Sequence, residues 1–580
     1  MIKRMSLALV AWVCISVGTM LTSAIPSIAA EDLERFSLDT GYQSTITQPL
    51  VVTRDGRILW ITGAPDSSAK GTFQVTWNEV RESRDSGRTW GPPRILFRGT
   101  PEVAIGASEM VRLASGKLLL IGSRFGGYSE DGDPAKSLLV GFSQISTDDG
   151  ATWSEPRPLP TGERYFNGGM SPIIQLSGGR IIFPFGYLTK EGMGRFNVSV
   201  LYSDDEGETW HRSQSNLSAG GYGNESGADE PCVVELPDGR VWMLIRYQAG
   251  FLYESFSSDQ GVTWKAPTPS RFPSSGAPAA LLRLRSGRIV VAWNNSVRRA
   301  YARHCLVMAA SDDGCRTFYG FREIAHTDYP VTSLDTYWGA MYPKLAEAPD
   351  GRILVAYNYG DWNFNQAKLV RVDPAWLKEG SLMEDFRNGR GAWCHLGANG
   401  DQLTAPEDNE PGASLQIDYQ KRGPSGIVRN FPLVSQGEMR LTITVLKPQA
   451  YLLWHDSFLD PGKTDEACLR VRFADNGQVF VGAGTPRTKD LGQGNEHRPT
   501  YSYLAYPVET EQAYPGKVKL GERFTVKVRC DVAKGEALLS INDGVEVNVP
   551  LGNILGLSYF GIAATEGGSI RLRRFESFQR

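Results

Sequence analysis

The chain has 580 residues, and its 61 basic side chains nearly balance its 64 acidic ones. This length predicts two or more domains, because a single domain mostly holds roughly 100–200 residues. The balanced charge gives no basic surface for nucleic acid, so no nucleic-acid partner is expected.

Residues 1–30 have the pattern of a secretory signal peptide. Lys3 and Arg4 precede an apolar run from Leu7 to Leu21, and small residues follow up to Ala30. Cleavage near the end of this segment would leave the mature protein periplasmic or extracellular. An uncleaved membrane anchor is the alternative, but Ser and Thr interrupt the short apolar run. No later segment is long and apolar enough to span a bilayer, so no membrane span is expected in the mature chain.

Seven cysteines occur, and Cys14 would leave with the signal peptide. The other six lack the spacing of metal ligands, so neither a metal nor a cofactor is expected. Export permits disulfides, and buried free thiols are the alternative. The six positions are Cys232, Cys305, Cys315, Cys394, Cys468 and Cys530.

An octet of the form Ser-x-Asp-x-Gly-x-Thr-Trp recurs along the chain. Its copies begin at Ser83, Ser146, Ser203, Ser257 and Ser311. The fifth copy is degraded, with Cys315 at the usual Gly position and a Gly one place earlier. The copies start 63, 57, 54 and 54 residues apart, which is the period of a four-stranded propeller blade. Ser, Asp and Gly explain the octet as turn chemistry, so neither calcium binding nor catalysis is expected there.

A second repeat interleaves with the octets. A turn glycine precedes an apolar strand six times, at Gly56, Gly116, Gly179, Gly239, Gly287 and Gly351. Six hairpins with five octets predict a six-bladed β-propeller over residues 31–378, whose last blade lacks an octet. Residues 31–52 are expected to help close the ring.

After Gly380 the octets stop and short alternating strands continue to the end of the chain. Residues 379–580 are therefore predicted to form an antiparallel β-sandwich, and the whole chain is all-β. The segment looks like the lectin-like jelly-roll modules often attached to glycosidases. Glycan binding and buttressing of the propeller are both open roles. Trp393, Tyr451 and Trp454 could be sugar platforms, and burial in the core is the alternative for each.

Propeller ligands bind near the central axis, at the ends of the innermost strands. Glu230 opens one strand and Arg246 ends the next, with the tight turn near Gly239 between them. The two side chains therefore lie at the same end of a hairpin. Tyr342 holds the same place in the sixth hairpin that Glu230 holds in the fourth.

These residues resemble the exo-sialidases of the sialidase (neuraminidase) superfamily, and the resemblance covers roughly residues 40–375. In that family a Glu lies sixteen residues before a substrate-binding Arg in the fourth blade, as Glu230 and Arg246 do. The family nucleophile lies eight residues before the Asp of an Asp-Gly turn, as Tyr342 does. A further family Arg is matched by Arg303.

The first blade departs from the family pattern. Thr47-Gln48-Pro49 stands where the family has Arg-Ile-Pro, so that Arg is not matched. Val75 stands at the position of the family acid/base Asp, and Asp66 in the nearby loop is the candidate substitute.

Other polar residues are candidates for substrate binding. Glu109 and Arg124 flank the second hairpin as Glu230 and Arg246 flank the fourth. Arg298 and Arg299 compete with Arg303 for its role. Further polar residues beside the third and sixth hairpins are Arg164, Tyr165, Asn167, Asp335, Tyr337, Asp361 and Trp362.

The chemistry implied by the resemblance is coherent. Sialic acid carries a carboxylate beside its anomeric carbon, and a carboxylate nucleophile at 4 Å would be repelled by about 1–4 kcal/mol. A phenol such as Tyr342 avoids this repulsion but needs a base, which is Glu230. Arginines clamp the substrate carboxylate.

We therefore expect an exported exo-acting glycoside hydrolase that releases sialic acid or a related acidic sugar from a glycan. Two alternatives stay open. One is another carbohydrate-active enzyme on the same propeller, a lyase or a non-sialidase glycosidase, in which His304 or His326 takes part. The other is an inactive glycan-binding protein.

Overall fold

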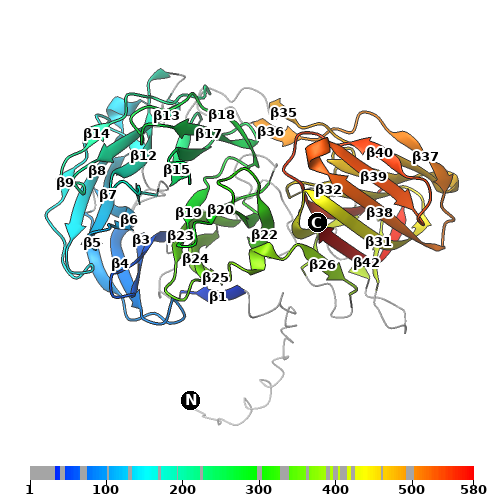
Figure 1. Cartoon of the computed structure of the whole chain (residues 1–580), viewed down its shortest axis with the longest axis horizontal. Coiled ribbons are helices and arrows are strands. Elements are labelled where there is room, and N and C mark those ends of the chain that lie inside the picture. Colours follow the sequence, from blue (N-terminus) through cyan, green and yellow to red (C-terminus); the bar gives the residue numbers. More distant parts are fainter. Residues whose placement is uncertain are drawn as a thin grey trace, which may run out of the picture.

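The computed structural model shows two β-sheet bodies side by side, a ring of small sheets and a sandwich (Figure 1). Among the described residues no helix is both long and apolar enough to cross a membrane. The structure describes residues 33–38, 46–65, 75–100, 103–127, 133–167, 172–191, 194–221, 226–296, 303–326, 339–360, 365–386, 392–395, 403–404, 414–419, 425–458, 462–490 and 502–580. The expected signal peptide lies outside these ranges, as do Asp66, Arg298, Arg299, Asp335, Tyr337, Asp361 and Trp362.

The first three sheets of the ring follow one another in the sequence. Blade 1 contains β2 (Ile46–Val52), β3 (Ile58–Pro65), β4 (Val75–Ser83) and β5 (Arg94–Arg98). Blade 2 contains β6 (Ala104–Arg112), β7 (Leu118–Gly127), β8 (Leu138–Ser146) and β9 (Arg157–Pro158). Blade 3 contains β10 (Phe166–Asn167), β11 (Ile174–Gln175), β12 (Ile181–Leu188), β13 (Phe196–Ser203) and β14 (His211–Arg212).

The other three sheets complete the six-bladed propeller. Blade 4 contains β15 (Asp229–Glu235), β16 (Val241–Arg246), β17 (Phe251–Ser257) and β18 (Thr268–Pro273). Blade 5 contains β19 (Ala280–Arg283), β20 (Ile289–Trp293), β21 (Cys305–Ser311) and β22 (Tyr319–His326). Blade 6 contains β23 (Gly339–Glu347), β24 (Ile353–Gly360), β25 (Asn365–Val372) and, as its outer strand, β1 (Leu33–Ser37).

The octets form one repeated turn. In the first copy Gly87 N donates to Ser83 Oγ at 2.8 Å, and Thr89 N donates to Asp85 Oδ1 at 2.8 Å. The same two bonds recur in the other four copies. In the fifth copy Gly314 and Cys315 are both left-handed, with φ of 72° and 66°. The turn needs two consecutive left-handed residues. The fifth copy has its Gly at the first of these positions, whereas the other copies have it at the second.

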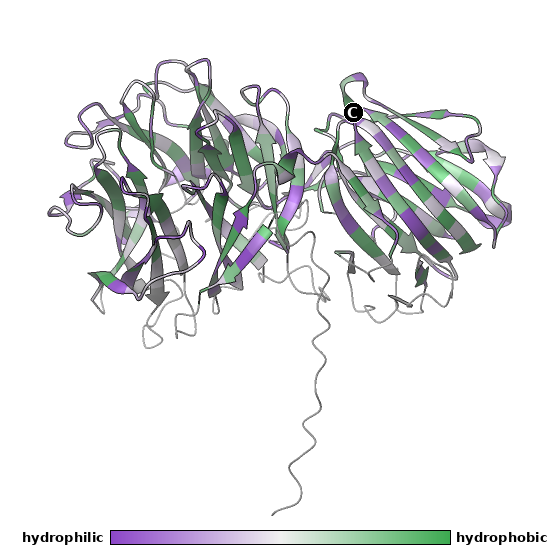
Figure 2. Ribbon diagram, turned by 60° about the horizontal axis from the view of Figure 1, so that its bottom comes forward, coloured by the Kyte–Doolittle hydropathy of each residue, from purple (hydrophilic) through white to green (hydrophobic). Residues whose placement is uncertain are grey.

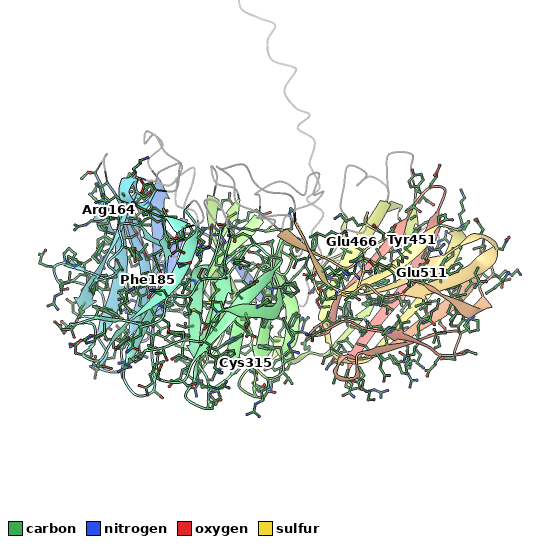
Figure 3. The ribbon with its side chains drawn as sticks, turned by 90° about the horizontal axis from the view of Figure 1, so that it is seen from above. Arg164, Phe185, Cys315, Tyr451, Glu466 and Glu511 are labelled. Atoms are coloured by element: carbon green, nitrogen blue, oxygen red, sulfur yellow. The ribbon has the colours of Figure 1, made fainter. Side chains whose placement is uncertain are left out.

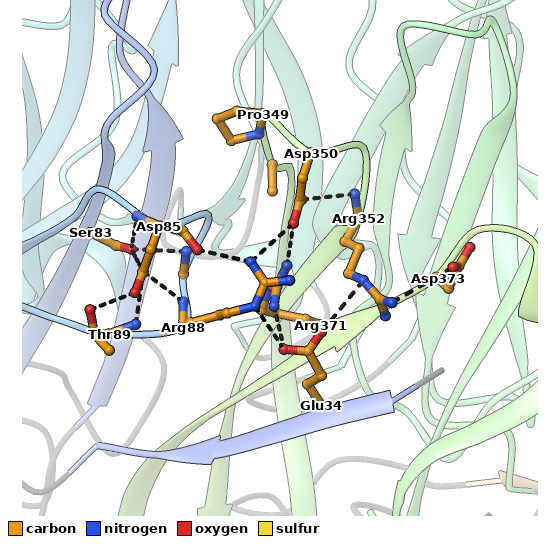
Figure 4. Close-up of polar contacts among 12 residues, drawn as sticks. Glu34, Ser83, Asp85, Arg88, Thr89, Pro349, Asp350, Arg352, Arg371 and Asp373 are labelled. Carbon is orange, nitrogen blue, oxygen red and sulfur yellow. Dashed lines mark hydrogen bonds and ion pairs between the residues drawn. The ribbon is translucent and has the colours of Figure 1, made fainter. Parts of the chain in front are cut away.

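The ring is closed by β1, which pairs antiparallel with β25 from Leu33 opposite Val372. The prediction that the N-terminal segment helps to close the ring is therefore confirmed. Figure 4 shows the ion pairs at this closure: fully buried Arg371 contacts both Glu34 of β1 and Asp350 of blade 6. Arg88 of the first octet lies 3.4 Å from Glu34, which joins blade 1 to the same network.

The second body is a sandwich of two antiparallel sheets. The first sheet runs in the order β28 (Leu403–Thr404), β29 (Leu415–Asp418), β42 (Ser569–Gln579), β31 (Gln436–Lys447), β38 (Arg523–Asp531), β39 (Glu536–Ile541) and β40 (Val547–Pro550), and β26 (Ser381–Glu384) pairs with β42. The second runs β27 (Cys394–His395), β30 (Ser425–Val434), β41 (Leu557–Ala564), β32 (Ala450–His455), β33 (Leu469–Phe473), β34 (Gln478–Gly482) and β37 (Gln512–Lys517). A separate hairpin contains β35 (Arg487–Asp490) and β36 (Ser502–Ala505).

Short 3₁₀ turns interrupt the strands. They are η1 (Pro134–Lys136), η3 (Trp376–Lys378), η5 (Asp475–Gly477) and η6 (Val532–Lys534). The turn η3 lies between β25, the last propeller strand in the sequence, and β26, the first sandwich strand.

The two bodies share a hydrophobic junction. Trp293 and Phe321 of blade 5 belong to the same buried cluster as Leu453, Phe458 and Tyr559 of the sandwich. Trp393 and Trp454 are also buried, in the sandwich core, and Tyr451 is only 8 % exposed at the junction. The sugar-platform interpretation is therefore wrong for these three aromatic residues, because their rings pack against protein. The five cysteines whose side chains are described are free thiols.

Candidate active site

The inner strands place their tight turns at one end of the propeller and the candidate residues at the other. The blade 1 turn meets the blade 2 octet, since Arg54 N donates to Asp149 Oδ1 at 3.1 Å. Figure 3 shows Cys315 of the fifth octet and Arg164, just before β10, at opposite edges of the propeller. Strands β15 and β23 therefore begin at the end that lies away from the octets.

Glu230 and Arg246 form a buried ion pair at this end. Asp229 lies opposite Arg246 in the register of β15 and β16. Arg246 Nη1 lies 2.5 Å from Glu230 Oε2, and the two side chains are 3 % and 6 % exposed. Asn167 of blade 3 donates to Asp229 Oδ2 at 3.3 Å and to Glu230 Oε1 at 3.5 Å. The prediction from the hairpin spacing, that these two side chains lie together, is confirmed.

Glu230 and Tyr342 share an unusual backbone. Their φ angles are 43° and 56°, in the left-handed region that side chains other than Gly avoid. Each stands at a register shift of its strand and precedes a proline, Pro231 or Pro343. Such a bulge re-aims a side chain, and the conformation costs roughly 1–3 kcal/mol per residue. Strain of this kind gathers at functional sites, which favours both residues as members of one site.

Tyr342 lies beside Arg303. The Arg303 guanidinium carbon is 4.5 Å from the centroid of the phenol ring, and Arg303 itself is fully buried. Burial raises the pKa of Tyr342 to about 12, Arg303 and Arg246 lower it, and Glu230 raises it. Arg303, Glu230 and Arg246 therefore lie close enough to Tyr342 to shift its pKa. The fold brings these four residues together from blades 4, 5 and 6.

A second ion pair lies on the inner strands next to this cluster. Lys344, two residues beyond Tyr342 on β23, contacts Glu109 of β6, and both side chains are 6 % exposed. Burial raises the pKa of Glu109, and Lys344 opposes this shift. The pair joins blade 6 to blade 2. The sequence patterns did not single out Lys344. Its position two residues after Tyr342 on an inner strand is the feature that indicates it.

Glu109 and Arg124 do not repeat the arrangement of Glu230 and Arg246. In the register of β6 and β7, Arg124 lies opposite Ile105 and Glu109 lies opposite Ile121. Arg124 is exposed, with its guanidinium carbon 5.6 Å from the Phe142 ring centroid. Glu109 lies seven residues before its turn glycine Gly116, whereas Glu230 lies nine residues before Gly239. The two carboxylates therefore stand at different heights on their strands, and the analogy between the two hairpins fails for this reason.

The first blade has a small side chain where the family carries an Arg. Thr47 is fully buried, its N donates to Asn358 Oδ1 at 2.6 Å, and its hydroxyl donates to Tyr357 O at 3.3 Å. Thr47 is therefore tied to blade 6 and brings no charge to the cluster.

The two histidines named from the sequence lie toward the sandwich. The ring centroids of His304 and of Phe458 in the sandwich are 6.1 Å apart. His326 lies near Glu323 at the junction, where burial raises the pKa of Glu323 and His326 opposes this shift. The arrangement around Tyr342 thus offers a phenol, a carboxylate and two guanidinium groups, which suits covalent attack on a substrate that carries an anion.

The fold and the cluster define a propeller protein of the sialidase type, and comparison with known proteins agrees. A BNR repeat-like domain is recognised over residues 79–355. These matches support a BNR-repeat propeller of the sialidase superfamily.

Similarity to individual proteins is low. The chain is 26 % identical to a sialidase of Micromonospora viridifaciens over 370 residues, which cover 57 % of this chain and 52 % of that protein. It is 26 % identical to a sialidase of Clostridium perfringens over 238 residues, which cover 37 % of this chain and 59 % of that protein. The chain spans about half the length of the curated relatives it matches. Among solved structures, Trypanosoma rangeli sialidase matches 95 % of this chain and 94 % of its own at 14 % identity and a TM-score of 0.46.

Proposed function

We propose that the chain is an exo-acting glycoside hydrolase that releases sialic acid or a related acidic sugar from glycans. The observation that carries the proposal is the cluster of Tyr342, Glu230, Arg246 and Arg303 at one end of the propeller. The low-identity sialidase relatives support the same reaction class.

In the proposed first step the Glu230 carboxylate accepts the phenol proton and the Tyr342 oxygen attacks the anomeric carbon. The bond to the leaving glycan breaks, and its oxygen takes a proton from a general acid. Asp66 is proposed for that acid on its sequence position alone. Water then cleaves the bond between sugar and Tyr342. A base is required because a pKa of about 12 leaves Tyr342 almost fully protonated at neutral pH.

The substrate carboxylate is assigned to Arg246 and Arg303. In the free protein Arg246 pairs with Glu230, and a bound carboxylate would share that guanidinium, which has five N–H donors. Glu109 and Arg124 are the weaker members of the proposed binding set. The Glu109 carboxylate is engaged by Lys344, and Arg124 lies over Phe142.

Thr47 favours a related acidic sugar as the second candidate substrate. With Thr47 at the position of the family Arg, the carboxylate would have two arginines in place of three. An acidic sugar whose anionic group needs fewer hydrogen-bond donors than a sialic acid carboxylate fits these two arginines.

The test combines a substrate panel with a covalent trap. Full-length protein is assayed on α-glycosides of sialic acid and of other acidic sugars, and then incubated with a 3-fluoro glycosyl fluoride of the best substrate. Digestion and mass spectrometry should place one adduct on Tyr342. An adduct on another residue would overturn the assigned nucleophile, and an absence of turnover across the panel at catalytic enzyme concentration would favour the glycan-binding alternative.

We also propose export, on the pattern of residues 1–30. N-terminal sequencing of the protein recovered from the periplasm or the medium should find a start at or just after Ala30. Recovery of the uncleaved chain in the cytoplasm alone would overturn this proposal.

A further inference from the structure

Four polar side chains gather in the sandwich where β32 ends. One ligand atom each of His455, Asp456 and Cys468 lies within 4.8 Å of the other two. Tyr506 joins them, because its hydroxyl donates to Asp456 Oδ2 at 2.6 Å and its ring centroid is 4.4 Å from that of His455. All four residues are at most 4 % exposed. The spacing of the cysteines gave no sign of this group, because folding alone brings Cys468 to the end of β32.

No Lys or Arg among the described residues balances the charge of Asp456. The nearest basic nitrogen among these residues is His455 Nδ1, at 3.4 Å from Asp456 Oδ1. Ser457 and Tyr506 donate hydrogen bonds to the carboxylate, but both hydroxyls are neutral. A buried carboxylate is costly unless it is paired with a charge or bound to a metal.

The donor atoms select the metal. A thiol, an imidazole and a carboxylate are the usual zinc ligands, whereas calcium and magnesium take oxygen atoms only. Zinc bonds of about 2.0–2.3 Å place tetrahedral ligand atoms about 3.3–3.8 Å apart. Ligand atoms within 4.8 Å of one another therefore need to move by only about 1 Å to bind a zinc ion.

We propose that His455, Asp456 and Cys468 bind one zinc ion, with the Tyr506 oxygen as the fourth ligand. The phenol proton stays in the hydrogen bond between Tyr506 and Asp456 Oδ2. Every ligand comes from the protein and the site is buried, so the zinc ion is structural. Cysteine binds zinc as the thiolate. When the sulfur bonds to zinc, the thiol proton leaves to solvent.

The zinc ligand Asp456 belongs to the segment 456–458, which contacts the propeller. Asn295 Nδ2 donates to Asp456 O at 3.0 Å, and Phe458 N donates to Asn295 O at 2.9 Å. The neighbouring Asn294 donates to Ala340 O at 2.8 Å, two residues before Tyr342. A zinc ion on Asp456 therefore fixes the junction between the two bodies next to the strand that carries Tyr342.

The experiment uses the full-length chain. It is stripped with a chelator, reloaded with zinc sulfate, freed of excess metal and analysed by inductively coupled plasma mass spectrometry. We expect about one zinc per chain, release of at least one proton per zinc bound at neutral pH, and a higher melting temperature. The variants Cys468→Ala and His455→Gln should hold less than a tenth of this zinc, while Cys530→Ala, which removes another buried sandwich thiol, should hold all of it.

X-ray absorption at the zinc edge keeps the proposal testable when a variant fails to fold. Wild-type protein should show one sulfur ligand at about 2.3 Å. Wild-type protein that retains no zinc, zinc without a sulfur ligand, or full zinc retention in Cys468→Ala would each overturn the proposal.

Discussion

The propeller and the sandwich bury their strands in different ways. In the propeller every residue of β12, β16 and β20 is buried, whereas β38 of the sandwich alternates between buried and more exposed residues. Figure 2 shows the same contrast, with hydrophilic and hydrophobic bands alternating across the sandwich. Propeller blades pack face to face around a ring, so both faces of a sheet meet protein, while the sandwich sheet that contains β38 has one face in solvent. The other sandwich sheet packs against the propeller, and every residue of its strands β32 and β41 is buried.

The difference teaches where each body holds its polar groups. Charged side chains are buried on the inner strands of the propeller, where Glu230–Arg246 and Glu109–Lys344 form ion pairs. The sandwich also buries charged side chains such as Asp456, but the large cluster between its sheets consists of apolar side chains. We therefore expect substitutions near the propeller axis to act mainly on activity and substitutions in the sandwich core to act mainly on stability.

The largest expected effect is on catalysis. Tyr342→Phe should lower kcat by at least roughly 10⁴-fold, because it removes the proposed nucleophile. Its melting temperature should stay close to that of the wild type, as measured by circular dichroism. Tyr202→Phe, in a propeller strand away from the site, is the matched control and should keep full activity. If Tyr342→Phe loses stability but keeps its kcat in the folded fraction, substitutions near the propeller axis do not act mainly on activity.

The sandwich core should show the opposite behaviour. Trp454 is fully buried and its ring centroid lies 5.0 Å from that of Phe560. Trp454→Ala should lower the free energy of unfolding by about 3–5 kcal/mol, because it leaves a large cavity. Urea titration measures this, and kcat is measured where the variant is still folded. Phe578→Ala, at a position 41 % exposed, should cost little.

At the ring closure we expect a buried charged side chain, Arg371, to stabilise the fold. Arg371 is fully buried between Glu34 and Asp350. Arg371→Met should lower the free energy of unfolding by roughly 3 kcal/mol, because it removes the buried cation from two carboxylates. Glu34 and Asp350 then keep only the longer ion pairs with Arg88 and Arg352. Arg352→Met, which removes longer ion pairs from the same network, should cost less. Equal losses in the two variants would show that the buried position does not matter.

Contacts between the propeller and the sandwich test whether the sandwich also affects activity. Gly250 follows Arg246 by four residues, and a Cβ there would lie 2.5 Å from Leu504 N of the sandwich hairpin. Gly250→Ala should shift this loop and lower kcat/KM about tenfold, because small misplacements of a catalytic group slow the reaction. Gly239→Ala has a similar positive φ but nothing within 4 Å of the added carbon, so it is the matched control. Identical kinetics in the two variants would argue against support of the site by the sandwich.

The smallest effect concerns pH at the junction. Burial raises the pKa of Glu323, which accepts a hydrogen bond from Tyr559 at 2.8 Å. The folded state thus holds the proton more tightly than the unfolded state, so Glu323 stabilises the fold below about pH 4.5, and this contribution is lost as the pH rises through the folded-state pKa. Denaturant titrations from pH 4.5 to 8 should show that Glu323→Gln flattens the slope.

Much of the fold could be predicted because its signals are local. The octets and the turn glycines fix hairpins within a few residues, and their period counts the blades. The pairing of Glu230 with Arg246 follows from one hairpin, whose turn lies midway between them. The contact of Lys344 with Glu109 joins blade 6 to blade 2, and no local pattern predicts a contact between separate blades.

The sequence by itself determined six blades, an alternating second body and the four residues around Tyr342, because turn chemistry and strand periodicity act over short distances. Only the tertiary structure decided that Thr47 is tied to Asn358, that Lys344 meets Glu109, and that the sandwich aromatic residues are buried. These contacts join residues far apart in the chain. Their formation depends on how the blades and the sandwich pack, which no local pattern records.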